Sequence, residues 1–225
     1  MQYLTAAQYG EALFMDRKSR FYGRIWPVET EEEARAILES IRKEYWDASH
    51  HVFAWRIGFS PESERFSDDG EPGGTSGLPT LNVLKGADVH NVLAVTTRYF
   101  GGTLLGTGGL VRAYTQAAAL ALAEAETALR EVVRPYTLAL EYTALGRLQY
   151  VLSREDFPVA DTVFSDRVEL TLYVPLSREA RFLKLIEEES DGRLVPVPGE
   201  ASWGARIGEA YRLFPESRVE LPKNT

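Results

Sequence analysis

The chain has 225 residues, of which 44% are hydrophobic and 26% charged, ordinary values for a globular protein long enough to hold two domains. It has no cysteine and only three histidines, which excludes disulfides, thiolate zinc sites and a cysteine nucleophile and disfavours a histidine-rich metal centre. The net charge of −8 divides evenly between the halves on either side of Arg134, so unspecific binding to duplex DNA is not expected.

The N-terminal segment has no basic start followed by an apolar run, and no stretch approaches the ~20 apolar residues of a membrane span. We therefore expect a cytoplasmic protein without membrane contact. The first clear elements are a strand at 20–28 and a helix that begins after Thr30, which forms a capping box with Glu33. The buried stripe of this helix consists of Ala34, Ile37, Leu38, Ile41 and Tyr45.

Three further elements and a long helix complete the first half. Residues 50–59 alternate as a strand does, 75–85 form a short helix, and 91–100 have the composition of a buried strand. An alanine-rich helix then runs from about Gly109 to Leu129, where small side chains permit close packing on a sheet or on a second helix.

The second half has the element order strand, helix, strand, strand, helix, strand, which is the order of the ferredoxin-like fold. Its predicted ranges are 136–142, 144–155, 157–164, 168–174, 177–190 and 193–198. The segment around Pro135 is the expected boundary, so the prediction is an α+β protein with unlike domains at 1–134 and 135–225. The tail 204–225 has apolar residues without a clear period, and its structure stays open.

The first candidate site is the acidic loop SDDGEPGGTSG. Clustered carboxylates could hold magnesium, and a glycine loop with hydroxyls could wrap an anion through its backbone N–H groups. The EF-hand spacing and the Walker A lysine are both missing, so a turn-rich surface loop with solvated acids is the alternative interpretation. The candidate residues of this site are His50, Asp68, Asp69, Glu71, Gly74, Thr75 and Ser76.

The second candidate is the glycine-rich loop RYFGGTLLGTGGLVR, which leads into a helix N-terminus where unpaired N–H groups favour an anion. It lacks the third glycine of a dinucleotide fingerprint, so it is predicted as a generic site for a phosphate, a carboxylate or an RNA backbone. Equally, its glycines could serve packing through positive φ angles and close approach. The candidate residues are Arg98, Tyr99, Gly101, Gly102, Gly106, Gly108, Gly109, Arg112 and Tyr114.

His50 and His51 open a strand, so their rings are expected on opposite faces, one packed and one presented. Without a hydroxyl or thiol partner in the sequence pattern, a structural role is favoured over that of a general base. His90 is expected in a loop.

Three segments together resemble the IMPACT family, in its bacterial YigZ-like branch. They are DASHHVFAWRIG, FSDDGEPGGTSGLPTLNVL and VTTRYFGGTLLGTGGLVRAYTQA, and they carry the family pattern R-[FYW]-[FYW]-G-G-x-x-[LIVM]-G at 98–106 and D-D-G-E-P at 68–72. The resemblance covers residues 18–128, and bacterial members are expected to append a ferredoxin-like domain.

The resemblance implies an N-terminal domain like domain IV of elongation factor G, a C-terminal domain like its domain V, and a role in translation control. The chain departs from the family pattern at several positions: Leu104 replaces a common lysine, His51 a common asparagine, and Gly74 a common serine. Without this lysine, the loop has one positive charge fewer for binding a phosphate.

Two functions are consistent with these observations. The favoured one is a regulatory binding protein that engages RNA, the ribosome or a translation-control protein through the glycine-rich loop, without a cofactor. The alternative is a magnesium-dependent enzyme acting on a nucleotide or a phosphorylated small molecule. No nucleophile and base pair is recognisable, so enzymatic activity is uncertain and catalytic residues are not assigned. The oligomeric state stays open, as does the question whether the two loops form one site.

Overall fold

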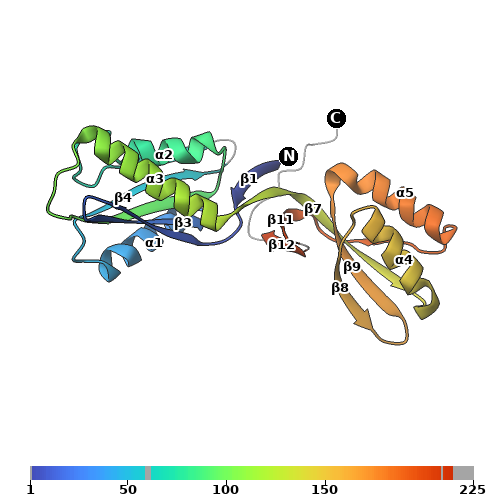
Figure 1. Cartoon of the computed structure of the whole chain (residues 1–225). Coiled ribbons are helices and arrows are strands. Elements are labelled where there is room, and N and C mark those ends of the chain that lie inside the picture. The colour runs from blue at the N-terminus through green and yellow to red at the C-terminus, as the bar shows by residue number, and fades with distance from the viewer. Residues whose placement is uncertain (1, 59–61, 209, 215–225) are drawn as a thin grey trace. The chain divides into compact units, whose positions relative to one another are not determined.

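The computed structural model describes residues 2–58, 62–208 and 210–214 and divides the chain into two compact α+β units (Figure 1). The N-terminal unit comprises Tyr3–Leu129, and the C-terminal unit comprises the chain from Arg130 onward together with Gln2. None of the described helices is long and apolar enough to cross a bilayer.

The N-terminal unit is built on a five-stranded antiparallel sheet with the strand order β2-β3-β6-β4-β5. The central strand, β6, is almost fully buried, as expected for a run of apolar and β-branched residues covered on both faces. The strands are β2 (Gly10–Asp16), β3 (Ser19–Pro27), β4 (His50–Ile57), β5 (Ser63–Ser67) and β6 (Val92–Tyr99). A further short strand, β1 (Gln2–Ala6), makes a parallel bridge from Leu4 to Val89.

Helices cover both faces of this sheet. Helix α1 (Glu31–Glu44) lies on one side, and α2 (Gly77–Gly86) and α3 (Thr107–Ala125) lie on the other (Figure 1). Alternation along β6 sorts its side chains between two cores: Leu93 and Val95 pack with α1, and Val92 and Ala94 pack with α2 and α3. We call the face toward α2 and α3 the inner face and the face toward α1 the outer face.

The buried stripe and the Thr30 cap predicted for α1 are confirmed. Ala34, Leu38 and Ile41 are buried in the outer core, and Thr30 Oγ1 accepts a hydrogen bond from the Glu33 N–H at 3.1 Å. The carboxylate of Glu33 reaches back to the N–H of Glu29, one residue before the one that a standard capping box would choose.

Helix α3 starts and ends earlier than predicted. It begins at Thr107 and ends at Ala125, because Glu126 takes a positive φ of 53° and the chain continues as a strand from Thr127. The prediction to Leu129 was wrong because Ala128 and Leu129 are good helix formers and nothing in their composition marks the break.

The C-terminal unit has the predicted ferredoxin-like arrangement, with the antiparallel strand order β10-β7-β9-β8. Its sheet and helices enclose a core that includes Leu138, Leu170 and Phe182. The elements are β7 (Thr127–Leu140), α4 (Tyr142–Arg154), β8 (Val159–Phe164), β9 (Val168–Pro175), the 3₁₀ turn Leu176–Arg178, α5 (Glu179–Ser190) and β10 (Val197–Pro198).

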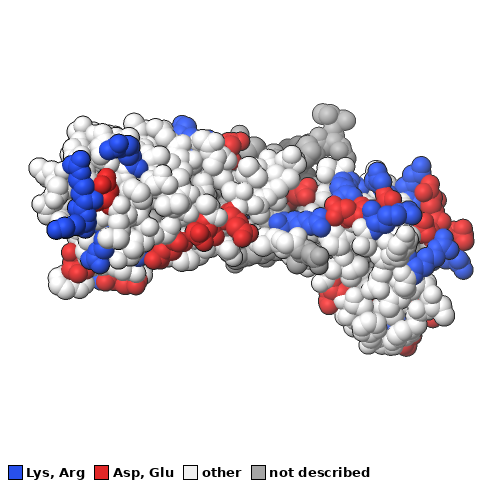
Figure 2. Space-filling view, in the orientation of Figure 1, with Lys and Arg blue, Asp and Glu red and all other residues white. Residues whose placement is uncertain are grey.

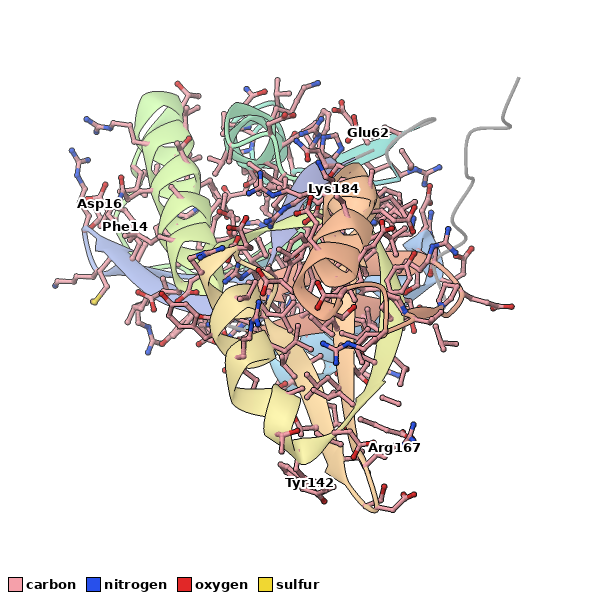
Figure 3. All side chains as sticks on the ribbon, turned by 90° about the vertical axis from the view of Figure 1, so that its right-hand side faces the viewer. Phe14, Asp16, Glu62, Tyr142, Arg167 and Lys184 are labelled. Carbon is pink, nitrogen blue, oxygen red and sulfur yellow. The ribbon has the colours of Figure 1, made fainter. Side chains whose placement is uncertain are left out.

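Two features of this unit lay outside the sequence-based predictions. The described part of the tail belongs to a hairpin of β11 (Ser202–Ile207) and β12 (Ala210–Phe214), and β11 pairs with the first half of β7; residues 215–225 lie outside the described part. Pro135 lies inside the continuous strand β7, opposite Tyr173 of β9. The hydroxyl of Tyr142, at the start of α4, donates a hydrogen bond to the carbonyl of Ser165. Ser165 lies in the turn between β8 and β9 that also carries Arg167 (Figure 3).

Candidate functional site

The acidic loop and the glycine-rich loop meet at the carboxylate of Glu71. Arg98, near the end of β6, places Nη1 2.5 Å from Glu71 Oε1, and the hydroxyl of Tyr114 on α3 donates to the same oxygen at 2.7 Å. All three side chains are buried. The two loops therefore share one polar cluster on the inner face, a question that the sequence left open.

The contacts of this cluster are internal to the protein. Burial and the hydrogen bond to Glu71 raise the pKa of the Tyr114 hydroxyl far above its usual range, so the group stays protonated and donates to the carboxylate. The positive charge of Arg98 faces the negative charge of Glu71 in a site with little water. Nη1 of Arg98 and the Tyr114 hydroxyl thus hold the acidic loop to the sheet through Glu71, whereas Nε of Arg98 is buried without a hydrogen-bond partner among the described residues.

Asp68 organises the acidic loop. Its carboxylate accepts hydrogen bonds from the backbone N–H groups of Gly74, Ser76 and Gly77 and from the Ser76 hydroxyl, at 2.8–3.1 Å. Burial alone would raise its pKa, but these donors outweigh burial and hold the pKa of Asp68 below its usual value. The Thr75 hydroxyl is likewise used within the loop, on the carbonyl of Pro72. The hydroxyls and N–H groups that the sequence offered to an anion are directed at the loop itself.

Asp69 fastens the loop to the start of β4. Its Oδ2 accepts from the N–H of His51 at 2.6 Å, its Oδ1 lies 3.2 Å from Arg42 on α1, and its carbonyl lies 2.8 Å from Nδ1 of His50. The two histidine rings lie on opposite faces, as predicted. His50 faces Glu71 with Nε2 3.8 Å from Oε1. His51 is buried near Thr97, and this burial lowers its pKa.

The carboxylates of the acidic loop do not converge on a common point. Each of Asp68, Asp69 and Glu71 has its own set of protein donors, as given above. Within the described part of the chain, no three His, Asp or Glu side chains are arranged to hold a metal ion.

The glycines of the second loop have different structural reasons. A Cβ on Gly101 would lie 2.1 Å from the carbonyl carbon of Lys18, so the loop touches the turn between β2 and β3 there. Gly106 has φ 73° and caps α3 without a side chain, and Gly102 has φ 80°. Gly108 and Gly109 lie in the first turn of α3, Gly108 with open space in front of it.

A cluster of basic side chains surrounds this loop, and sequence reasoning found only one of its members. Arg17 and Lys18 form the turn between β2 and β3, Arg20 follows near the start of β3, and Arg112 comes from α3; all four are exposed. The guanidinium of Arg17 donates to the carbonyl of Leu104 at 3.3 Å, which ties the turn to the loop. We call these four residues the basic end of the N-terminal unit. Figure 2 shows Lys and Arg side chains gathered at the end of the unit where α3 begins.

The basic end differs from most of the other cations of the unit. Arg24, Arg35, Arg42, Arg56, Lys85 and Arg98 each have a carboxylate within ion-pair distance. Within the described residues, none of the four cations of the basic end has such a partner. Asp16 adjoins the same turn beside Phe14 (Figure 3), but it lies on the inner face of β2.

Tyr99 and Arg98 are neighbours in sequence and lie on opposite faces. Tyr99 is on the outer face, where its hydroxyl donates to Asp47 at 2.9 Å and Arg20 lies over its ring at 5.0 Å. The structure therefore separates the predicted anion-binding residues into two groups: Arg98 and Tyr114 are internal, whereas Tyr99, Arg112 and the glycine-rich loop are at the surface.

The comparisons with known proteins agree with this organisation. A family model described as the Impact N-terminal domain matches residues 17–122, and one described as a domain of unknown function, DUF1949, matches 138–193. The IMPACT family member YvyE of Bacillus subtilis is 34% identical over 201 residues, which is 89% of this chain and 93% of the relative.

Two further matches are of similar extent. The IMPACT family member YigZ of Escherichia coli is 38% identical over 180 residues, 79% of this chain and 88% of the relative. A crystal structure described as that of a hypothetical protein is 35% identical with a TM-score of 0.57, and it covers 88% of this chain and 98% of that one. Both domains and near full-length similarity place this chain as a member of the IMPACT family.

Proposed function

We propose that the protein is a translation-associated regulatory binding protein whose N-terminal unit engages ribosomal particles through their RNA backbone. Membership of the IMPACT family supports a role in translation control. The observation that carries the proposal is the basic end, where four exposed and unpaired cations surround the glycine-rich loop on a unit whose other arginines are mostly ion-paired.

Unpaired cations on an acidic protein are suited to a local phosphate site. Helix α3 begins without a side-chain cap, and Gly108 in its first turn is exposed. Backbone N–H groups at a helix start carry partial positive charge, so they would attract the same phosphate as the cations do. The net charge of −8 disfavours unspecific binding of nucleic acid to the rest of the surface. Contact with the RNA backbone would therefore be confined to the basic end.

The turn that presents two of these cations is strained. Arg17 and Lys18 form the two-residue loop between Asp16 and Ser19, and both have positive φ, at 45° and 67°. Asn-Gly is the favoured sequence for such a turn, because most side chains resist the left-handed region. Keeping two long cations there at a cost in stability supports a binding role for the turn.

The enzymatic alternative receives less support from the geometry. The three carboxylates proposed to hold magnesium bind groups of the protein itself, and the Ser76 and Thr75 hydroxyls are used in the same way. We therefore propose no catalytic residue and no cofactor.

Sedimentation of purified ribosomes through a sucrose cushion tests the proposal, with the full-length protein at low and high salt. Arg17→Glu/Arg112→Glu reverses two charges of the basic end. The matched control is Lys43→Glu/Arg65→Glu, because these two cations are also exposed and without a carboxylate at ion-pair distance, but Lys43 lies on α1 and Arg65 on β5.

We expect co-sedimentation at low salt that weakens steeply as salt rises, and a roughly tenfold or greater loss for the first variant only. Equal binding of both variants, or equal loss in both, would contradict the assignment to the basic end. Absence of co-sedimentation at every salt concentration would refute the ribosomal partner, and calorimetry with ATP, GTP and magnesium would then test the alternative.

A further inference from the structure

The outer face of the N-terminal sheet is only partly covered by α1. The core under α1 consists of residues from α1, β4, the first half of β6 and the end of β3, and it includes Trp55, Leu93 and Val95. Among the described residues, β2 contributes nothing to this core. The strands β2 and β3 and the end of β6 therefore leave a strip of the outer face open, and Leu13 and Met15 on it are 47% and 58% exposed.

This strip carries aromatic rings beside cations. Strand register places Leu13 opposite Tyr22 and Arg20 opposite Tyr99, and Tyr22 and Tyr99 meet edge to face with centroids 6.0 Å apart. The Arg20 guanidinium lies over Tyr99. We call Leu13, Met15, Arg20, Tyr22 and Tyr99 the aromatic strip.

Two carboxylates near the strip, those of Glu11 and Asp47, each accept a hydrogen bond from a side chain of the protein. Glu11 accepts from Arg24 at 2.9 Å, and Asp47 accepts from the Tyr99 hydroxyl. Among the described residues, no carboxylate lies within ion-pair distance of Arg20. Because the turn Arg17-Lys18 joins the two strands that bear the strip, the strip is continuous with the basic end.

A surface of partly exposed aromatic rings, exposed aliphatic side chains and an arginine without a carboxylate partner among the described residues has the chemistry of a platform for single-stranded nucleic acid. Unpaired bases stack on aromatic rings and on guanidinium planes, and the phosphates between them pair with nearby cations. Duplex RNA hides its base faces inside the helix and could use only the cations. A protein partner would need no such row of cations next to the rings.

We infer that the aromatic strip binds unpaired bases of single-stranded RNA, stacked against Tyr22 and Tyr99, while Arg17, Lys18 and Arg20 bind the adjoining phosphates. This inference rests on the proposed function, because it names the RNA feature that the basic end would meet. It assigns selectivity to the strip and electrostatic attraction to the basic end.

Fluorescence anisotropy of fluorescein-labelled oligouridylate with the full-length protein tests the inference, with the same strand annealed to oligoadenylate as the duplex probe. Tyr22→Leu/Tyr99→Leu removes both rings and keeps apolar volume. Tyr22→Phe/Tyr99→Phe keeps both rings. The matched control is Tyr142→Leu/Tyr150→Leu, two exposed tyrosines of the C-terminal unit.

We expect the wild type to prefer the single strand, and the leucine variant to bind it about tenfold more weakly for each ring removed. The phenylalanine variant and the control should bind as the wild type does. Leu13→Glu/Met15→Glu adds two anions at exposed edge positions, which folding tolerates, and should also abolish binding.

Several results would overturn the inference: no binding of oligouridylate, equal affinity for single strand and duplex, or unchanged binding by both the leucine and the glutamate variants. If ribosome co-sedimentation persists while oligouridylate does not bind, the proposed function stands and the base-stacking inference fails. If oligouridylate binds but ribosomes do not, the inference stands and the ribosomal partner fails.

Discussion

The end of β6 sets two neighbouring residues in opposite environments. Arg98 points to the inner face, where it pairs with the carboxylate of Glu71, which also accepts a hydrogen bond from Tyr114 in a buried cluster. Tyr99 points to the outer face, where it lies half-exposed under Arg20, a cation without a carboxylate partner. Both residues belong to the same short motif, RYFGG.

One short motif thus supplies both a buried ion pair that stabilises the fold and a surface residue that is available for binding. On the inner face, polar groups are paired with one another, and removing one of them leaves the other buried and unpaired. On the aromatic strip and at the basic end, cations lack a carboxylate partner among the described residues and the Arg17-Lys18 turn is strained, so changes there should alter binding while leaving the fold intact or more stable.

The largest expected effect is on the inner face. Glu71→Ala leaves the cation of Arg98 buried without its anion, so we expect the free energy of unfolding of the N-terminal unit to fall by about 3–5 kcal/mol. Urea denaturation followed by tryptophan fluorescence measures it. The double variant Glu71→Ala/Arg98→Met, which removes the charge as well, should recover much of the loss; failure to do so would show that the buried pair is not the cause.

An exposed ion pair provides the contrast for that measurement. Glu189→Ala removes the partner of Arg147, whose side chain is 74% exposed, and should cost less than about 1 kcal/mol. Similar losses in the free energy of unfolding for Glu71→Ala and Glu189→Ala would show that burial does not make the Arg98–Glu71 pair more important for stability than an exposed pair.

The next effect concerns the acidic loop. Asp68→Ala removes the acceptor of three backbone N–H groups, so we expect a loss of about 1–3 kcal/mol at neutral pH. The folded-state pKa of Asp68 lies below its unfolded value of about 3.9, so its contribution is complete well above pH 4 and disappears as the pH falls through the folded-state pKa. The gap between variant and wild type should therefore close in acid.

Denaturation at a series of pH values measures this gap. Glu39→Ala, an exposed position on α1, serves as the control and should show a small difference at neutral pH. A gap for Asp68→Ala that widens in acid would contradict the assigned direction of the pKa shift.

The smallest effect expected of the N-terminal loops and turns has the opposite sign, because it raises stability. Arg17→Asn/Lys18→Gly places the preferred residues in the turn and should raise the free energy of unfolding by about 1–2 kcal/mol while weakening ribosome co-sedimentation. Asp191→Gly relieves a similar left-handed residue, φ 51°, at the end of α5 and should leave co-sedimentation unchanged. A turn variant that is more stable and still binds ribosomes as the wild type does would show that the strained turn is not kept for binding.

Much of the fold was predictable because it is encoded locally. The capped stripe of α1, the alternation of β4 and the βαββαβ order all follow from residue spacing. The strands β1, β2 and β5 and the tail hairpin were missed, because short edge strands take their stability from the strand beside them more than from their own composition.

The candidate site was predictable in its residue types and not in their roles. Motif spacing identified Arg98, Glu71 and Tyr99 as notable, but Arg98 and Glu71 are 27 positions apart and only the sheet brings them into contact. The basic end was missed for the same reason, because Arg17 and Arg112 belong to elements that are distant in sequence.

By itself, the sequence determined the family, the two-domain α+β class and the glycines that the second loop requires, because these depend on local pattern and backbone geometry. The tertiary structure alone decided which charges are neutralised and which are free. Pairing of charges depends on which strand faces and loops are brought within a few ångströms, and that distance is a property of the packed chain.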